Sequence, residues 1–129
     1  MTGLLSKGPD SPAVLLYNFT AKELEAWKFR MRGFPGIRLI PVPQSAYGLT
    51  LREILSGQTA TAFAKTTAFF RPMLVFANIP EPLVHPLIAI CRQITTEKVL
   101  KAMLTDTNRN WTSAVLYENL VEEEAMLGG

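Results

Sequence analysis

The apolar runs AVLLYNF (residues 13–19) and MLVFANI (residues 73–79) decide the fold of this chain. Each run is short and uncharged and lies between polar or turn-forming residues, which is typical of a strand buried on both faces. The two runs are 60 residues apart, and at that shift Asn18 coincides with Asn78. We therefore expect two central strands at equivalent places in two similar halves.

The same order of elements follows each central run: a helix, a second strand and a second helix. Capping boxes, in which a Thr and a Glu three residues later satisfy free backbone amides, begin both helices of the first half. They are formed by Thr20 with Glu23 and by Thr50 with Glu53. The second strands are predicted at residues 37–43 and 97–104, and the last helix follows Thr112.

This order predicts an α/β fold of two tandem βαβα units related by internal duplication, at residues 13–57 and 73–127 and joined by 58–72. One unit cannot bury its own sheet, so the two should form one four-stranded sheet covered by helices, within a single domain of residues 1–129. The Pro-bearing strand 37–43 and the Lys-bearing strand 97–104 belong at the edges, which gives the strand order 2-1-3-4. The sequence leaves open whether the halves meet parallel or antiparallel.

Composition narrows the class of function. Lys and Arg number 13 against 11 Asp and Glu, and a net charge of +2 does not indicate nucleic-acid binding. No apolar stretch of about 18 residues predicts a membrane span, no signal peptide is recognisable, and a cytoplasmic location is expected. The lone Cys91 and lone His85 exclude an internal disulfide and the usual multi-Cys or multi-His metal sites. We expect no metal and no cofactor.

The octapeptide TDTNRNWT (residues 105–112) is the most polar and distinctive stretch, and it falls between a predicted strand and a predicted helix. Its counterpart in the first half is PQSAYGLT (residues 43–50). Such loops lie at the carboxyl ends of strands, where open α/β sheets usually bind ligands. Trp111 is expected to pack into the core at the start of the last helix. The candidate ligand-binding residues are Asp106, Thr107, Asn108 and Arg109, together with Tyr47, Asn18 and Asn78.

Two interpretations of this loop are open. In the first, its Asp, Thr and Asn side chains bond to nearby backbone and make a rigid turn that caps the last helix. In the second, Asn108 and Arg109 hold an anionic or polar group in front of the helix amides. The loop contains no Gly, which excludes a P-loop and a dinucleotide-binding turn. No Ser-His-Asp or Cys-His constellation can be assembled, so enzymatic activity stays undecided.

The chain resembles a group of small bacterial proteins of unknown function. The resemblance rests on VLLYNFTAKEL (14–24), RLIPVPQSAYGLTLREILSG (38–57) and KAMLTDTNRNWTSAVLYENLVEEE (101–124). Shared features are the LLYNF-type start, the Tyr-Gly turn at residues 47–48 and the TNxxW loop before an acidic C-terminal helix. The resemblance covers nearly the whole chain and implies no activity, substrate or cofactor.

The joint between the halves differs from that group, because ATAFAKTTAFFRP (60–72) is apolar. Three aromatic side chains there, Phe63, Phe69 and Phe70, need burial partners. Either they pack on their own sheet, or they meet a second chain. We predict a homodimer whose interface is drawn partly from residues 59–72.

Two functional hypotheses follow. The first is a non-enzymatic binding or regulatory module, since no catalytic constellation is found. The alternative is a protein or enzyme that binds a small, anionic molecule through the loops 43–50 and 105–112. A shared cleft between the two loops would favour the alternative, whereas loops at opposite ends of the sheet would favour the module.

Overall fold

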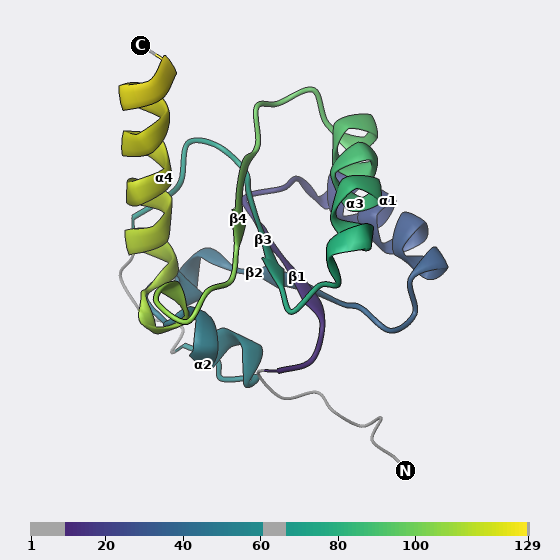
Figure 1. Cartoon of the computed structure of the whole chain (residues 1–129), viewed down its shortest axis with the longest axis horizontal. Coiled ribbons are helices and arrows are strands. Elements are labelled where there is room, and N and C mark those ends of the chain that lie inside the picture. Colours follow the sequence, from purple (N-terminus) through teal and green to yellow (C-terminus); the bar gives the residue numbers. More distant parts are fainter. Residues whose placement is uncertain (1–9, 61–66, 129) are drawn as a thin grey trace.

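The computed structural model, which describes residues 10–60 and 67–128, has a four-stranded sheet between two pairs of helices (Figure 1). The strand order is β2-β1-β3-β4, so the predicted α/β class, sheet size and strand order are confirmed. The internal duplication stays a prediction. The strands are β1 (Ala13–Tyr17), β2 (Arg38–Val42), β3 (Met73–Ala77) and β4 (Leu100–Met103). The helices are α1 (Ala21–Arg30), α2 (Leu51–Leu55), α3 (Glu81–Ile94) and α4 (Ser113–Gly128).

The two central strands run antiparallel, with Ala13 opposite Ala77 and Tyr17 opposite Met73. Each central strand pairs with its own second strand in parallel, β1 with β2 and β3 with β4. This answers the question that the sequence left open. It also means that the carboxyl ends of β1 and β2 lie at one end of the sheet and those of β3 and β4 at the other.

Both central strands stop two residues earlier than the apolar runs suggest. Asn18 and Asn78 adopt left-handed backbone conformations, with φ of 62° and 57°. Asn tolerates this conformation better than most residues because its short side chain bonds locally, and the turn takes the chain out of the sheet. β4 is also shorter than the predicted strand 97–104, because the chain is still turning after α3.

Alternation along the central strands divides the core into two layers. Side chains of Val14, Leu16, Leu74 and Phe76 pack beneath α1 and α3. Those of the intervening residues, such as Leu15 and Val75, pack beneath α2 and α4. The strands are buried on both faces, as their unbroken apolar sequences predict.

Both capping boxes form as predicted. The Glu23 and Glu53 backbone amides each donate to the Thr hydroxyl three residues earlier at 3.1 Å, and each carboxylate accepts from that Thr's own amide. α2 ends at once, because Gly57 turns left-handed with φ of 88°.

Each outer edge of the sheet has features that oppose pairing with another strand. In β2, the Arg38 amide donates to the Pro12 carbonyl, so every second residue from Arg38 directs its backbone bonds to β1. The backbone nitrogen of Pro41 therefore lies on the outer side, where a residue without an N–H leaves no free donor. At the β4 edge, the Lys101 ammonium donates to the Val99 carbonyl at 3.3 Å. The Asn108 side-chain amide donates to the Met103 carbonyl at 3.0 Å. These features oppose pairing with another strand at either edge.

The described part of the joint is fixed to the chain's own core by Phe69. Its ring is stacked between Tyr47 and Tyr117, with centroids 4.0 Å away on each side, and only 7% of Phe69 is exposed. The next residue, Phe70, is 93% exposed. Phe63 lies outside the described residues. Phe69 is therefore a core residue, and only Phe70 of this pair is free to contact another molecule.

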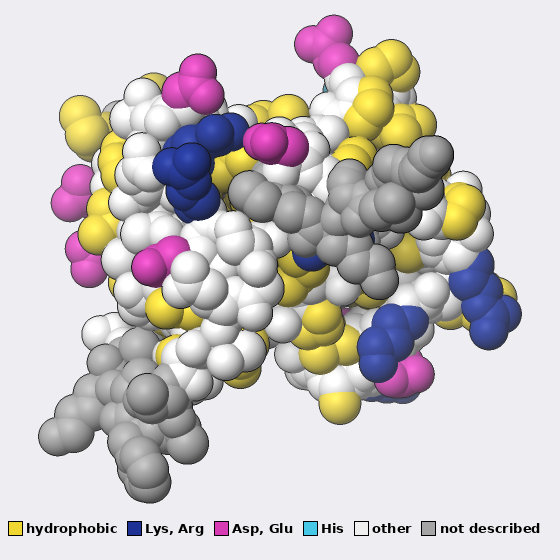
Figure 2. Space-filling model, turned by 90° about the horizontal axis from the view of Figure 1, so that it is seen from below, with side chains coloured by type: hydrophobic (Ala, Val, Ile, Leu, Met, Phe, Trp, Pro, Cys, Tyr) yellow, Lys and Arg dark blue, Asp and Glu magenta, His cyan; other side chains and the backbone are white. Residues whose placement is uncertain are grey.

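The face of the molecule seen in Figure 2 mixes the two signs of charge. Lys and Arg side chains are interspersed with Asp and Glu, and apolar side chains lie between them. No helix in the described part of the chain combines the length and the apolar character needed to cross a bilayer.

The different burial of two adjacent phenylalanines gives a matched test. Phe69→Ala should lower the free energy of unfolding by about 3–5 kcal/mol, because it leaves a cavity between two tyrosine rings. Phe70→Ala should change it by less than about 0.5 kcal/mol, as exposed substitutions usually do. Urea unfolding of both variants measures the difference, and equal effects would contradict the assignment of Phe69 to the core.

Candidate functional site

The octapeptide 105–112 is a closed turn built around Asn108, which is 7% exposed. The Asn108 side-chain oxygen accepts from the Thr105 amide at 2.8 Å, and the Asn108 amide donates to the Thr105 hydroxyl at 3.0 Å. The side-chain nitrogen donates to the Met103 carbonyl. All of these groups bond within the loop and its strand, which is the turn-and-cap arrangement of the first interpretation.

The other candidates of this loop do not converge on one point. Asp106 and Thr107 are exposed. The guanidinium of Arg109 lies 4.0 Å from the Asp106 carboxylate, a surface contact of little energetic weight. Thr112, the last residue of the loop, accepts from the Val115 amide and caps α4. Trp111 is half-buried against the core, so the expectation of a fully packed anchor is only partly met.

Asn18 and Asn78 both brace neighbouring segments. The Asn18 side-chain amide donates to the Phe69 carbonyl at 2.9 Å, and the Asn78 amide donates to the Ser11 carbonyl at 3.3 Å. Because β1 and β3 are antiparallel, the two asparagines follow opposite ends of the sheet. They therefore do not face a shared cleft.

The two strand-to-helix loops start at opposite ends of the sheet and meet where their helices begin. Thr50 and Thr112 form an isolated antiparallel bridge. The Leu51 amide donates to the Trp111 carbonyl at 3.0 Å, and the Ser113 amide donates to the Leu49 carbonyl at 3.3 Å. Backbone bonds thus join the starts of α2 and α4, and the loops are tied together rather than opened around a cavity.

The second half of the chain, from β3 to the end of α4, is the part that a known domain covers. Residues 72–127 match the sequence profile of a domain of unknown function, DUF3783. The match supports the expectation of an uncharacterised domain family and assigns no activity. No curated protein and no solved structure matches the chain.

A hollow of about 390 Å³ outside this DUF3783-like half lies at the carboxyl ends of β1 and β2. It contains two of the predicted candidates, Asn18 and Tyr47, with Gln44 as a further polar residue. Apolar residues provide the rest of the lining, which includes no Lys or Arg and nothing from residues 105–112. The hollow therefore offers polar side chains of uncharged residues and no cationic side chain.

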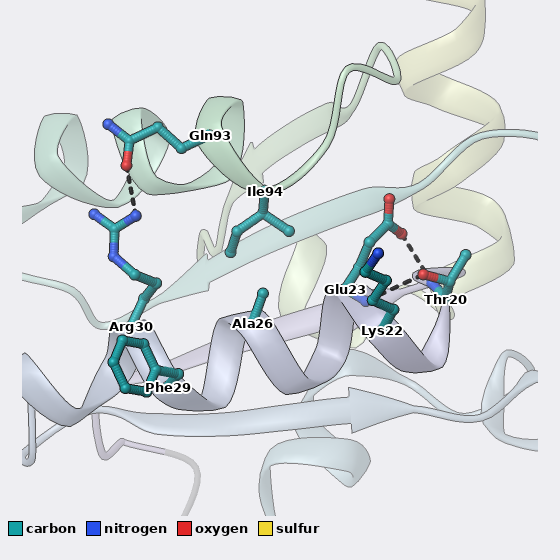
Figure 3. Close-up of a pocket in the computed structure, with 8 residues that line it drawn as sticks. All are labelled: Thr20, Lys22, Glu23, Ala26, Phe29, Arg30, Gln93 and Ile94. Atoms are coloured by element: carbon teal, nitrogen blue, oxygen red, sulfur yellow. Dashed lines mark hydrogen bonds between the residues drawn. The ribbon is translucent and has the colours of Figure 1, made fainter.

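A second hollow, of about 430 Å³, lies between α1 and α3 (Figure 3). Its polar side chains are engaged with one another: Glu23 bonds to Thr20 in the capping box, and Arg30 reaches across to the Gln93 side chain. Phe29, which also lines it, is 64% exposed, and the Arg32 guanidinium lies 5.3 Å from its ring centroid. Lys22, which also lines this hollow, has no ion-pair partner within residues 10–60 and 67–128.

Groups capable of catalysis are dispersed. Within residues 10–60 and 67–128, no three His, Cys, Asp or Glu side chains lie together as a metal site requires. Burial raises the pKa of the Cys91 thiol, against the smaller opposing effects of Lys101 and Arg92, which makes it a poor nucleophile. His85 is exposed on α3.

The sequence missed one surface, which we call the Phe70 groove and which is formed by the joint together with α4. It is a hollow of about 380 Å³ between the segment before β3 and the outer side of α4. The run of aromatic residues in the joint was its signal, but the sequence did not show which ring is buried. The groove is lined by Thr67, Ala68, Phe69, Phe70, Ala114, Tyr117, Glu118, Val121 and Glu122.

Asn108 provides the test of the closed turn. Asn108→Ala removes the two bonds of the side chain and leaves the Thr105 amide and the Met103 carbonyl without this partner, so the free energy of unfolding should fall by about 1–3 kcal/mol. Thr107→Ala, one residue earlier and exposed, should change it by less than about 0.5 kcal/mol. Chemical denaturation measures both, and a neutral Asn108→Ala would mean that the side chain does not hold the loop.

Two buried tyrosines predict a loss of stability in alkali. Burial raises the pKa of both Tyr17 and Tyr47 above the ordinary 10.0, although the Ser113 hydroxyl and the Asn18 backbone act in the opposite direction. Since the folded pKa exceeds the unfolded one, their contribution to stability is complete below pH 10 and is lost as the pH rises further. Tyrosinate absorbance and circular dichroism should therefore change together above that pH. Ionisation of both residues near pH 10 with the fold intact would contradict this.

Proposed function

We propose that this protein is a non-enzymatic binding module that recognises another protein. The observation that carries this proposal is the use of the predicted site residues as structural braces. The side chains of three predicted site residues form hydrogen bonds to backbone groups of the same chain: Asn108, Asn18 and Asn78. Asn18 also lines the hollow at the ends of β1 and β2, but Asn108 and Asn78 do not, so the predicted residues do not converge on one accessible cleft as a catalytic or ligand-holding role would require.

The exposed apolar side chains support recognition of a protein. Phe70 is almost entirely exposed and lies beside the outward-facing Val121 of α4. Large aromatic residues are enriched at the contact surfaces of proteins and often dominate their binding energy. An exposed aromatic residue on a folded segment is therefore the type of group by which a small domain without catalytic residues engages a partner.

The alternative function, a small-molecule protein, rests on the hollow formed by Asn18, Gln44 and Tyr47 at the ends of two parallel strands. Ligands in α/β sheets usually bind at this position. Because the lining holds no cation, the ligand in that case would be an uncharged polar molecule rather than the anion suggested by the sequence.

A thermal-shift screen separates the two functions. The panel contains nucleotides, phosphorylated metabolites, metal ions and uncharged polar metabolites. A ligand present at 100 times its Kd would add about 2.7 kcal/mol of stability, which is readily seen as a rise in Tm. We expect no such rise. A compound that stabilises the wild type, and that loses its effect when Gln44→Ala alters the hollow, would overturn the proposal in favour of the alternative.

A further inference from the structure

The Phe70 groove offers an apolar surface whose main contact residue is held in place. The backbone amides of Phe70 and Arg71 both donate to the Tyr117 hydroxyl, at 3.0 and 3.1 Å. The preceding ring, Phe69, is locked in the tyrosine stack. Phe70 thus projects 93% exposed from a fixed backbone. A partner that covers it would lose little of its binding energy to ordering this segment.

The rim of the groove is acidic. Glu118 and Glu122 lie one helical turn apart on α4, are exposed, and line the groove, which has no Lys or Arg in its described lining. Among residues 10–60 and 67–128, neither carboxylate has an ion-pair partner. The nearby cations Arg71 and Lys98 are both paired with Glu124, which lies outside the groove lining.

The exposed aromatic residue on α1, Phe29, differs from Phe70 in its charged neighbour. Phe29 on α1 lies under the guanidinium of Arg32, so its ring is partly satisfied within its own chain. At the Phe70 groove, an exposed ring lies beside two carboxylates that have no ion-pair partner among the described residues. A matching surface would present apolar side chains together with cations.

We propose that the Phe70 groove binds a basic amphipathic helix of a partner protein, an inference that rests on the proposed function. Apolar side chains of that helix would cover Phe70 and Val121, and Lys or Arg residues would face Glu118 and Glu122. Glu118 and Glu122 are at positions i and i+4 of a helix, where Cβ atoms are about 5–6 Å apart, so cations one turn apart on a neighbouring helix match them. Amphipathic helices bind apolar grooves through anchors with this spacing.

A second copy of the chain fits this surface less well. A two-fold dimer through the Phe70 groove would place the acidic rims of the two copies against each other, and like charges across an interface oppose binding. The sheet edges are also protected by Pro41, Lys101 and Asn108. Charge therefore favours a basic partner over the homodimer that the sequence suggested.

The experiment begins with a selection. A phage-displayed library of helical peptides of about 16 residues, roughly four turns, is selected on the full chain and counter-selected on Phe70→Ser. Enriched peptides should carry apolar residues at helical spacing with Lys or Arg beside them. Enrichment of acidic or uncharged peptides, or no enrichment beyond the Phe70→Ser control, would overturn the proposal.

The most enriched peptide is then measured by fluorescence anisotropy against matched variants. Phe70→Ser and the double variant Glu118→Lys with Glu122→Lys should each weaken binding about tenfold or more, as loss of a central contact does. Phe29→Ser and Glu123→Lys should leave Kd within about twofold, since Phe29 lies on α1 and Glu123 lines a different hollow. Equal weakening by Glu123→Lys would show unspecific attraction and overturn the proposal.

Two outcomes separate this proposal from the function on which it rests. Peptides that are enriched without the counter-selection and bind Phe70→Ser with unchanged Kd would place the contact elsewhere, so the groove would be wrong while the binding module stands. Sedimentation of the wild type at tens of micromolar tests whether a second copy of the chain occupies the groove. A dimer that Phe70→Ser dissociates would assign the groove to a second copy and overturn the partner helix.

Discussion

The antiparallel pairing of β1 with β3 is the constraint on which the rest of the structure depends. Each βαβ connection determines only how its own two strands are arranged, with its helix on one face of the sheet. It does not determine which helix of the other half packs beside its second helix. Once Ala13 is opposite Ala77, the β1–β2 pair and the β3–β4 pair run in opposite directions in the sheet. α1 and α3 then share one face and α2 and α4 the other, as Figure 1 shows. The same constraint sends the two strand-to-helix loops to opposite ends of the sheet.

The face covered by α2 and α4 is held together by aromatic and polar contacts that cross the boundary between the halves. Tyr47 belongs to the first half, Tyr117 to the second, and Phe69 of the joint lies stacked between them. Beneath the stack, the Tyr17 hydroxyl and the Ser113 hydroxyl are hydrogen-bonded at 2.7 Å, buried from water. The halves therefore depend on one another on this face, which explains why the segment before β3 is fixed in its path.

Much of this architecture could be predicted from the sequence, because periodic burial and capping are local signals. The capping boxes, the two uncharged central strands and the edge positions of β2 and β4 all follow from residues close together in the chain. The site could not be predicted in the same way. An Asn at position 108 looks the same in the sequence whether its side chain binds a ligand or the backbone. Only the positions of Thr105 and Met103 in the folded chain show that it binds the backbone. Phe69 and Phe70 are likewise identical in sequence terms, and the tyrosine rings that bury one of them come from remote parts of the chain.

The protected outer edges have a consequence for biosynthesis. In the finished sheet, the pairing groups of β1 that face β3 are satisfied, but β3 is made some 60 residues after β1. At a synthesis rate of about 5–20 residues per second, that edge of β1 waits several seconds for its partner. During this interval the first half exposes an uncharged, β-prone strand, whereas β2 already carries Pro41 at its outer edge. The ribosome-bound chain is therefore more open to aggregation on the inner side of β1 than at the rim of the sheet.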